Sequence, residues 1–285
     1  VVDRHFGLEV VPRTEIVELA APTFHYSGKY DDGKLPRKVG SFQVFVDAFR
    51  SASDVVPCLE LLRLKYPSFD LAFHLELERL IVLDYIIRNT DRSEDNWLVH
   101  VTWLNRAGQV ISSAPVPPVD LPDARAVVKI AAIDNGLAFP WKHPDEVRAY
   151  PYSWASLPNC RVPFSRALRS RLLPLLDDPD AWDDLVERLH AVFRHDRAFT
   201  DRHFCRQMSV MRGQLRNLRE CLRNGGSPFD LLAMPPLRVE DDGDAFHARY
   251  GRRSDHGGFV RDERGPGGRL QWIRQVDSRP CFPFC

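Results

Sequence analysis

Apolar residues recur at helical spacing through the second half of the chain. One stripe begins after the capping residues Asp177–Asp180, and another is ended by Gly225 and Gly226. Apolar positions three and four residues apart share one face of a helix, so we predict helices over residues 165–224 with that face in the core. The stripes comprise Trp182, Leu185, Val186, Leu189, Val192 and Phe193, then Phe204, Met208, Met211, Leu215, Leu218 and Leu222.

The first half of the chain combines one long helix with short strands. Residues Leu71–Ile87 contain neither glycine nor proline and are rich in Leu, Glu and Arg, which favours a helix. Residues 105–126 are proline-rich and lack periodicity, which predicts a loop. Short apolar runs predict strands at Glu15–Leu19, Ser41–Val46, Trp97–Val101 and Val127–Ile133.

Composition excludes some classes of function. The 285 residues contain 39 Lys and Arg and 39 Asp and Glu, which gives a formal net charge of zero. This balance argues against a nucleic-acid-binding protein that works through bulk positive charge. No apolar run reaches the roughly 18 residues that a membrane-spanning helix needs. The six cysteines form no CxxC pair, and we interpret them as reduced thiols of an intracellular protein.

The end of the chain differs in composition from the rest. Residues 238–285 are rich in Gly, Arg and Asp, and they hold few apolar residues. Such a segment buries too little apolar surface to offset the entropy cost of ordering. We therefore predict a mostly disordered tail that can be deleted without loss of folding.

Candidate chemistry concentrates where the long helix ends. Asp91 stands in a polar loop after that helix, Asn96 follows five residues later, and Asp134 opens an Asp-Asn-Gly turn after the next strands. Phosphoryl transfer requires a carboxylate that orients the attacking hydroxyl, and an amide and a second carboxylate that hold magnesium ions. Protein kinases space the Asp and Asn of their catalytic loop in the same way.

Two further carboxylates compete for these roles. Asp84 lies within an apolar part of the predicted helix, so we expect a structural hydrogen bond there. Asp95 is interpreted as a residue that shapes the loop. An Asp and an Asn at this spacing also occur by chance in many loops, so the flanking helix and strands carry the interpretation.

Long segments of the chain match motifs of one known family. Asp84–Arg92 (DYIIRNTDR), followed by Asp95–Leu98 (DNWL), resembles the catalytic loop of type II phosphatidylinositol 4-kinases. The resemblance extends over residues 8–236. Further matching segments are Val11–Thr14, Lys38–Gln43, Lys129–Pro140, Lys142–Asp145, Arg148–Pro151, Leu157–Pro158, Val162–Ser165, Met211–Gln214 and Met234–Pro236.

The resemblance implies a fold and an activity. It implies an α+β, kinase-like bilobal fold that is mostly the helical C-lobe with part of the β-rich N-lobe. Residues 1–47 would form the end of the N-lobe and the hinge, and residues 48–236 the helical C-lobe with the catalytic and activation loops. The implied enzyme is a 1-phosphatidylinositol 4-kinase, which transfers the γ-phosphate of ATP to the 4-hydroxyl of phosphatidylinositol with Mg²⁺.

The resemblance also implies roles for single residues. Asp91 is similar to the family's catalytic aspartate, and Arg92 beside it is included with the catalytic residues. Asn96 is similar to the metal-binding asparagine, and Asp134 to the aspartate that holds magnesium on ATP. The stretch Gln43, Val44, Phe45 and Val46 is similar to the hinge whose backbone contacts adenine.

A membrane substrate implies a membrane-facing surface. Lys142 or His143 would attract the lipid phosphate, and Tyr152 and Trp154 would face the bilayer as interfacial aromatic residues. We expect peripheral association with the cytoplasmic face of intracellular membranes, Golgi or endosomal. The oligomeric state is left open.

The chain departs from the family at its beginning. Nothing in residues 1–46 matches the loop that covers the nucleotide or the lysine that contacts the phosphates. We therefore expect a truncated kinase. The alternative is a catalytically inactive scaffold, derived from such a kinase, that binds a membrane or a partner protein.

Overall fold

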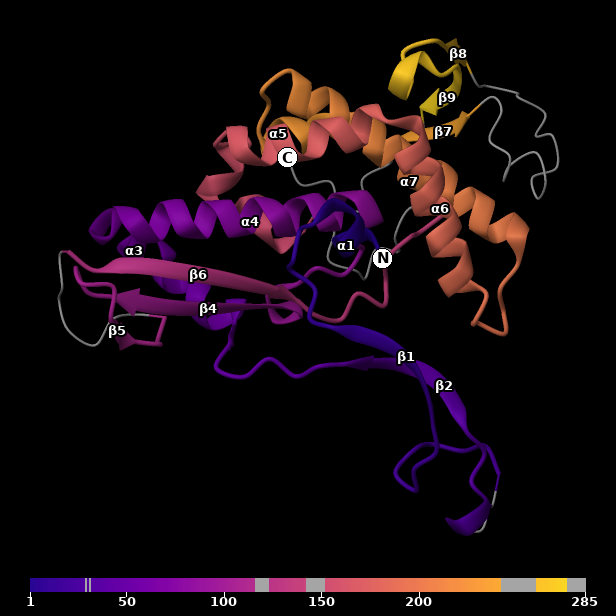
Figure 1. The fold of residues 1–285 in the computed structure, drawn as a ribbon, viewed down its shortest axis with the longest axis horizontal. Coiled ribbons are helices and arrows are strands. Elements are labelled where there is room, and N and C mark those ends of the chain that lie inside the picture. Colours follow the sequence, from indigo (N-terminus) through magenta and orange to yellow (C-terminus); the bar gives the residue numbers. More distant parts are fainter. Residues whose placement is uncertain (29, 31, 116–122, 142–151, 242–259, 276–285) are drawn as a thin grey trace.

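A long helix lying along an antiparallel sheet forms the centre of the molecule. The computed structural model describes residues 1–285 except 29, 31, 116–122, 142–151, 242–259 and 276–285. Helix α4 (Pro67–Ile87) packs on strand β6 (Arg125–Ala132), which pairs with β4 (Trp97–Leu104) (Figure 1). Every second residue of β4 is buried, because alternate side chains of a strand point to opposite faces. The predicted long helix and these two strands are confirmed, and each is longer than predicted.

Short elements complete this part of the chain. Strands β3 (Arg50–Ser51) and β5 (Val110–Ser112) both pair with β4, so the segment 105–126 predicted as a loop contains a strand. Helices α2 (Ala52–Val55) and α3 (Leu59–Lys65) precede α4. Short 3₁₀ turns span Asp32–Lys34, Val56–Cys58, Glu94–Asn96, Ser153–Ser156, Pro158–Arg161 and Pro266–Gly268.

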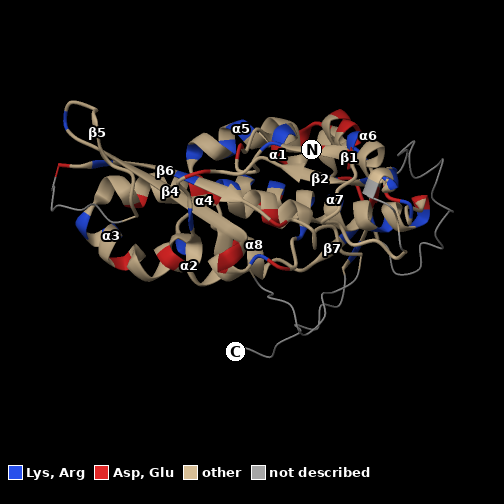
Figure 2. Ribbon diagram, turned by 90° about the horizontal axis from the view of Figure 1, so that it is seen from below, with Lys and Arg blue, Asp and Glu red and all other residues tan. Residues whose placement is uncertain are grey.

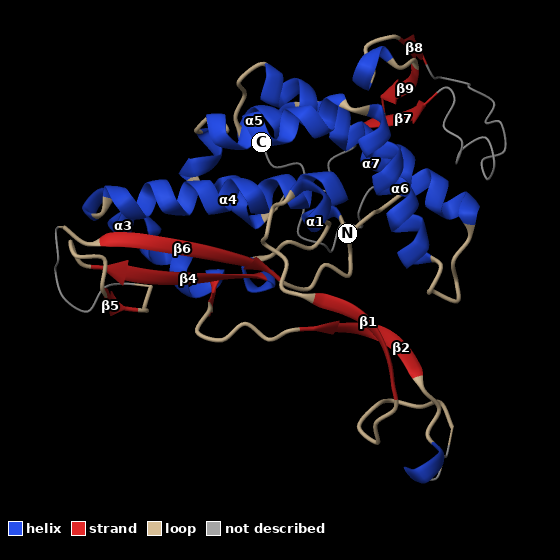
Figure 3. Cartoon of the chain, viewed as in Figure 1, coloured by secondary structure: helices blue, strands red, loops and turns tan. Residues whose placement is uncertain are grey.

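A second helical layer covers the other side of α4 (Figure 3). Its members are α5 (Arg166–Asp177), α6 (Pro179–Phe193), α7 (Asp201–Arg223) and α8 (Pro228–Ala233). Helix α7 contacts α4, α5, α6 and α8, which confirms the predicted helical region. The predicted stripes face the core except at Val192, which is exposed. Side chains cap the helix starts, as Ser165 does for α5, so the first backbone N–H groups are satisfied.

A two-stranded ribbon projects from the body on the N-terminal side (Figure 1). Helix α1 (Val2–Phe6) packs on α4, and strands β1 (Thr14–Leu19) and β2 (Lys38–Gln43) then form the ribbon. The strand predicted at Ser41–Val46 ends at Gln43. Large apolar side chains of the ribbon and of the residues after it are exposed, among them Ile16, Val39, Phe42, Val44 and Phe45.

The predicted disordered tail is wrong for the described residues after 236. Strands β7 (Leu237–Asp241), β8 (Val260–Asp262) and β9 (Gln271–Gln275) form a three-stranded sheet in the order β7-β9-β8. β7 packs on α7, and Val239 is fully buried. Residue 213 of α7 is a glycine that permits this approach, because a Cβ there would lie 1.9 Å from the carbonyl oxygen of Leu237.

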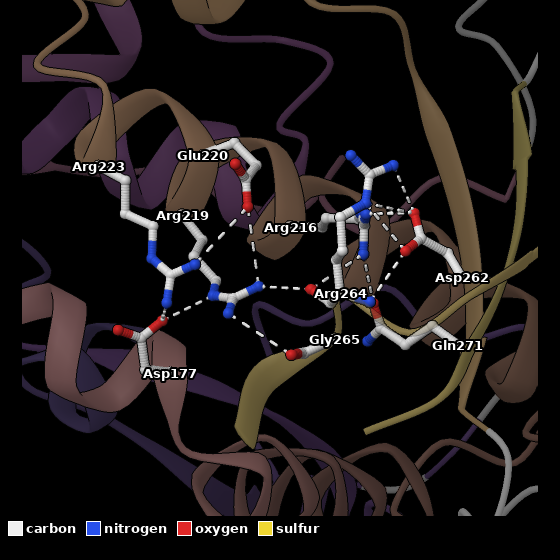
Figure 4. Close-up of polar contacts among 9 residues, drawn as sticks. All are labelled: Asp177, Arg216, Arg219, Glu220, Arg223, Asp262, Arg264, Gly265 and Gln271. Carbon is white, nitrogen blue, oxygen red and sulfur yellow. Dashed lines mark hydrogen bonds and ion pairs between the residues drawn. The ribbon is translucent and has the colours of Figure 1, made fainter. Parts of the chain in front are cut away.

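Buried arginines supply the contacts that composition did not predict (Figure 4). Arg216 of α7 donates to the side chains of Asp262 and Gln271, and both hydrogen bonds are 2.8 Å long. Arg219 donates to the backbone oxygen of Arg264 at 2.8 Å and to Asp177 at 2.6 Å. A segment poor in apolar residues is thus ordered by charged hydrogen bonds, which are stronger than neutral ones.

Charge is mixed over the described surface. Figure 2 shows Lys and Arg interspersed with Asp and Glu along the helices, α3 included. Among the residues that the structure describes, no helix combines the length and the apolar character needed to cross a bilayer.

Candidate active site

The polar loop after α4 is built by turns that leave the Asp91 carboxylate at its surface. α4 ends where Arg88 takes a left-handed conformation with φ 44°. The side-chain oxygen of Asn89 accepts from the Asp91 backbone N–H at 3.0 Å, and the Thr90 hydroxyl donates to the Leu137 carbonyl at 2.8 Å. These bonds fix the loop backbone, while the Asp91 carboxylate accepts no hydrogen bond from any described residue.

Strand register brings the end of this loop beside the Asp-Asn-Gly turn. Trp97 of β4 lies opposite Ala132 of β6, so the residues just beyond that pair, Asn96 and Ile133, are neighbours. The Ile133 N–H donates to the Asn96 carbonyl at 3.1 Å. Asp134 follows with φ 48°, a left-handed conformation that Asp tolerates better than most residues. The pairing of two antiparallel strands therefore sets Asn96 next to Asp134.

The buried side chain of Arg92 connects the Asp91 loop to the Asp-Asn-Gly turn. Its guanidinium donates to the Asn96 carbonyl, to the Ile133 carbonyl at 2.7 Å and to the Asn135 side chain. The side chain of Arg92 is 0% exposed. The prediction that Arg92 is a catalytic residue is wrong, because a guanidinium with no accessible surface cannot reach a substrate.

The partner of Arg92 is the buried carboxylate of Asp84. Arg92 Nε and Nη2 lie 3.0 Å from Asp84 oxygens, and the Trp154 indole N–H donates to the same carboxylate at 2.9 Å. Burial raises the pKa of the Asp84 carboxyl, and the Arg92 charge with the two sets of hydrogen bonds opposes that rise. The prediction of a structural hydrogen bond at Asp84 is confirmed.

Tyr152 and Trp154 face the core rather than a membrane. Trp154 is fully buried, and the Tyr152 hydroxyl donates to the Asp84 carbonyl at 3.1 Å. The two rings stack with centroids 4.6 Å apart. The prediction that these residues contact the bilayer is therefore wrong. An aromatic pair with polar edges is suited both to a membrane surface and to a buried hydrogen-bond network, and sequence alone does not distinguish these two positions. Lys142 and His143 lie outside the described residues.

Asp95 shapes the loop, as expected. Its carboxylate accepts from Ser53 at 3.1 Å and from Ser51 at 3.3 Å. Both serines lie near the start of α2, so Asp95 anchors the loop to the segment after the ribbon.

The oxygens at the loop surface suit a divalent cation shared with phosphates. The Asn96 amide nitrogen donates to the Asp91 carbonyl at 2.7 Å, which leaves its side-chain oxygen for another partner. The Asp134 carboxylate is exposed and accepts no hydrogen bond from the residues described. No cluster of three or more His, Cys, Asp or Glu that could hold a metal occurs in the described parts of the chain. Mg²⁺ is usually held by one or two carboxylates plus substrate phosphates, so Asn96 and Asp134 fit it.

The predicted adenine-binding stretch is only partly free to bind. The Val44 N–H donates to the Arg13 carbonyl at 2.9 Å, and the Gln43 side chain donates to the Thr14 hydroxyl at 3.0 Å. Within the described residues, the backbone N–H groups of Phe45 and Val46 form no backbone hydrogen bond. A backbone N–H that donates to a base from this stretch would therefore be that of Phe45 or Val46.

A cavity of about 510 Å³ brings the ribbon and the Asp-Asn-Gly turn together. Gln43 lines it from the ribbon, and Asp134 and Asn135 line it from the turn, with apolar side chains of α4 and α6 between them. Asp91 and Asn96 do not line this cavity. The roles predicted for Asp91, Asn96, Asp134 and Gln43–Val46 stay predictions.

Sequence reasoning missed Asn135, whose side chain accepts from Arg92. The available signal was its place between Asp134 and Gly136, which marked a turn but gave the middle residue no role.

Comparison with known proteins places the chain in a family. A family model described as phosphatidylinositol 3- and 4-kinase matches residues 3–214, which include both loops and the ribbon. The chain belongs to this family. It is 42% identical over 266 residues to phosphatidylinositol 4-kinase type 2-beta of Rattus norvegicus, with 84% of the chain and 54% of that protein covered. It is 41% identical over 260 residues to the type 2-alpha protein of Danio rerio, with 84% and 57% covered.

These relatives confirm the resemblance to type II phosphatidylinositol 4-kinases. The mixture of helices and sheets is consistent with a kinase-like α+β fold. The chain spans about half the length of the curated relatives that it matches.

Proposed function

We propose that the chain carries the phosphoryl-transfer site of a 1-phosphatidylinositol 4-kinase. One observation carries this proposal: the register of β4 and β6 sets Asn96 beside Asp134, with Asp91 five residues before Asn96 in a loop tied down by its own backbone. This set of oxygen-bearing groups is the one that phosphoryl transfer from ATP needs. The relatives named as phosphatidylinositol 4-kinases support the substrate and the position of transfer.

Each residue has a distinct task in this proposal. The Asp91 carboxylate accepts the proton of the attacking inositol hydroxyl and orients its oxygen toward the γ-phosphate. The Asn96 side-chain oxygen and the Asp134 carboxylate would hold the metal. Mg²⁺, when bound, neutralises part of the negative charge on the phosphates. The Asn96 amide also holds the Asp91 carbonyl, so the group that binds metal and the loop that orients the hydroxyl are one unit.

The cellular setting follows from the proposed substrate. Phosphatidylinositol is anchored in a bilayer, so we propose peripheral association with the cytoplasmic face of intracellular membranes, Golgi or endosomal. Since Tyr152 and Trp154 are buried, the surface that meets the bilayer must be formed by other residues.

The test uses the natural protein that carries this chain. It is incubated with Mg²⁺, ATP labelled at the γ-phosphate and vesicles that contain phosphatidylinositol. We expect labelled phosphatidylinositol 4-phosphate, with the position of the phosphate established by chromatography of the deacylated product. A label at another hydroxyl, or no label in lipid while free ATP is hydrolysed, would overturn the proposal. Vesicles of phosphatidylcholine alone serve as the control.

The alternative, an inactive scaffold, is not favoured. The chain keeps an Asp, an Asn and a second Asp in one loop cluster, and the relatives are named as kinases. A scaffold would not need Asp91 or Asp134, and their substitution would leave its binding to vesicles unchanged.

A further inference from the structure

We infer that Arg92 is a positioning residue that sets the spacing between Asn96 and Asp134, and thereby the affinity of the site for its divalent cation. The inference rests on the proposed function, because it concerns the cation of that site. Its basis is the set of groups that one buried guanidinium holds.

The guanidinium of Arg92 holds three segments of the chain at once. Asp84 belongs to α4, Asn96 ends the Asp91 loop, and Ile133 with Asn135 brackets Asp134. A planar fork with several N–H donors in fixed directions can hold such a set, whereas a lysine ammonium acts as a single compact charge. Arg92 touches the residues on both sides of Asp134 but not its carboxylate, which stays free for a cation.

Burial makes this arrangement rigid. Arg92 and Asp84 both have 0% exposed side chains, and breaking a buried pair by removing one partner leaves an uncompensated charge. The carboxylate of Asp84 is itself fixed by the Trp154 indole. The guanidinium therefore cannot move without disturbing the core. The two loops bonded to it are held in place as a result.

Fixed spacing matters for Mg²⁺ in particular. This cation demands nearly ideal octahedral geometry with short metal–oxygen distances, so ligands that move apart lose much of their affinity. Asn96 and Asp134 come from different loops. Thr90 also ties these loops together through two hydrogen bonds to the Leu137 carbonyl, but the bonds at Asn96 and on either side of Asp134 are those of Arg92 and one backbone hydrogen bond from Ile133 to Asn96. Arg92 thus controls the geometry of the metal ligands without touching substrate.

The test replaces Arg92 and a matched arginine. Arg92→Lys keeps the charge and loses the fork. Asn135→Ala removes one acceptor of Arg92 without leaving a buried charge. The control is Arg219→Lys, since Arg219 is also a buried arginine bound to an Asp and to backbone carbonyls, but it lies between α7 and the C-terminal sheet (Figure 4).

Two measurements separate positioning from stability. The affinity for Mn²⁺ in the presence of saturating ATP is measured by electron paramagnetic resonance, and the melting temperature is measured in parallel. We expect Arg92→Lys to weaken Mn²⁺ binding about tenfold or more and Asn135→Ala to weaken it several-fold. Arg219→Lys should lower the melting temperature and leave Mn²⁺ affinity unchanged. If Arg92→Lys does not fold, Asn135→Ala decides.

Each remaining outcome has a defined meaning. Unchanged Mn²⁺ affinity in both loop variants, or no Mn²⁺–ATP binding by the unaltered protein, overturns the inference. Equal losses in Arg92→Lys and Arg219→Lys would reduce Arg92 to a structural role and also overturn it. If Arg92-dependent Mn²⁺ binding is found but no lipid is phosphorylated, the proposed function fails and the inference stands.

Discussion

The two sides of the candidate site differ in how firmly the chain holds them. Around the Asp91 loop, Arg92 and Asp84 are fully buried and bonded to several segments. On the ribbon side, the Phe45 ring is 86% exposed, and neither strand of β1–β2 has a second partner strand among the described residues. The side that would hold the metal and the hydroxyl is fixed by the body of the protein. The side predicted to hold the base rests on an element that is barely supported.

Physical reasons account for this difference. An isolated two-stranded ribbon is at best marginally stable in water, because it buries little apolar surface. A buried ion pair with full hydrogen bonding has no nearby alternative arrangement, since leaving either group unpaired is costly. The contrast predicts that substitutions in the body lower the free energy of unfolding by several kcal/mol, and that similar substitutions in the ribbon change it little.

The largest effect is expected from removing the C-terminal sheet. Ending the chain after Pro236 deletes Val239, the acceptors of Arg216 and the backbone acceptors of Arg219, which keeps only Asp177 as a hydrogen-bond acceptor. Burial of one apolar side chain contributes about 2 kcal/mol, and each charged hydrogen bond about 1.5–3 kcal/mol. We expect the melting temperature to fall by about 10 °C or more.

The matched control for this truncation ends after Gln275 and removes only residues 276–285. Its melting temperature should exceed that of the chain ending at Pro236, because it keeps Val239 and the acceptors of Arg216. If both truncations melt like the full chain, the C-terminal sheet does not support α7, and the composition-based expectation of a dispensable tail would be correct after all.

The next effect compares one substitution in the two regions. Phe73 is fully buried between α4 and the sheet, so Phe73→Ala should cost about 3–5 kcal/mol. Phe45→Ala should change stability by no more than about 0.5 kcal/mol, because the ring is exposed. Denaturant unfolding of both variants measures the difference. A large loss for Phe45→Ala would mean that the ribbon packs against part of the protein and that the contrast between the two regions is false.

A smaller free-energy effect is expected at Asp91. It concerns the activation free energy of phosphoryl transfer and tests the proposed function directly. Asp91→Asn removes the proton acceptor and keeps the shape, so lipid phosphorylation by the natural protein should fall at least about 100-fold, or about 2.7 kcal/mol. The melting temperature should stay the same, since the carboxylate accepts no hydrogen bond within the described structure. Asp95→Asn is the control, because its side chain only anchors the loop to Ser51 and Ser53. Near-normal turnover in Asp91→Asn would exclude Asp91 as the catalytic base.

Sequence patterns predicted the parts of the fold that apolar periodicity determines. The helices over 165–224 and the alternating strand β4 follow from burying one face of a regular element. The grouping of Asp91, Asn96 and Asp134 was also predictable, because antiparallel strands return the chain to the place where it left. The role of Asp84 followed from its position inside an apolar helix.

The errors share one cause. Tyr152 and Trp154 bond Asp84 from 68 and 70 residues away, and Arg92 bonds the distant residues Ile133 and Asn135 as well as nearby ones, so the burial of all three depends on tertiary contacts that no local pattern reports. The C-terminal sheet was missed for the same reason. The folding of this sheet depends on Arg216 and Arg219, which lie on α7. An argument from composition treats arginines as exposed to solvent and so does not reveal these contacts.

The smallest expected effect tests how that sheet is held by charge. Hydrogen bonds from the Arg264 side chain lower the pKa of the Asp262 carboxyl to about 2, and the Arg216 charge assists. A carboxyl whose pKa is lower in the folded protein than its ordinary value of 3.8 stabilises the fold above that value. The stabilisation is lost as the pH falls through the folded pKa.

Asp262→Asn should therefore lower the melting temperature by a few degrees at neutral pH, because it removes the charged partner of a buried guanidinium. The difference between the natural chain and the variant should shrink as the pH falls from about 4 toward about 2, since the Asp262 carboxyl then becomes protonated first in the unfolded state and progressively in the folded state. Asp54→Asn, at an exposed position of α2, is the control and should show no difference at any pH. A difference for Asp262→Asn that persisted unchanged at pH 2 would mean that the side chain supports the sheet through shape and neutral hydrogen bonds. Arg216 would then be held by Gln271 and the Arg264 carbonyl alone, and the C-terminal sheet would keep its place without the ion pair between Arg216 and Asp262.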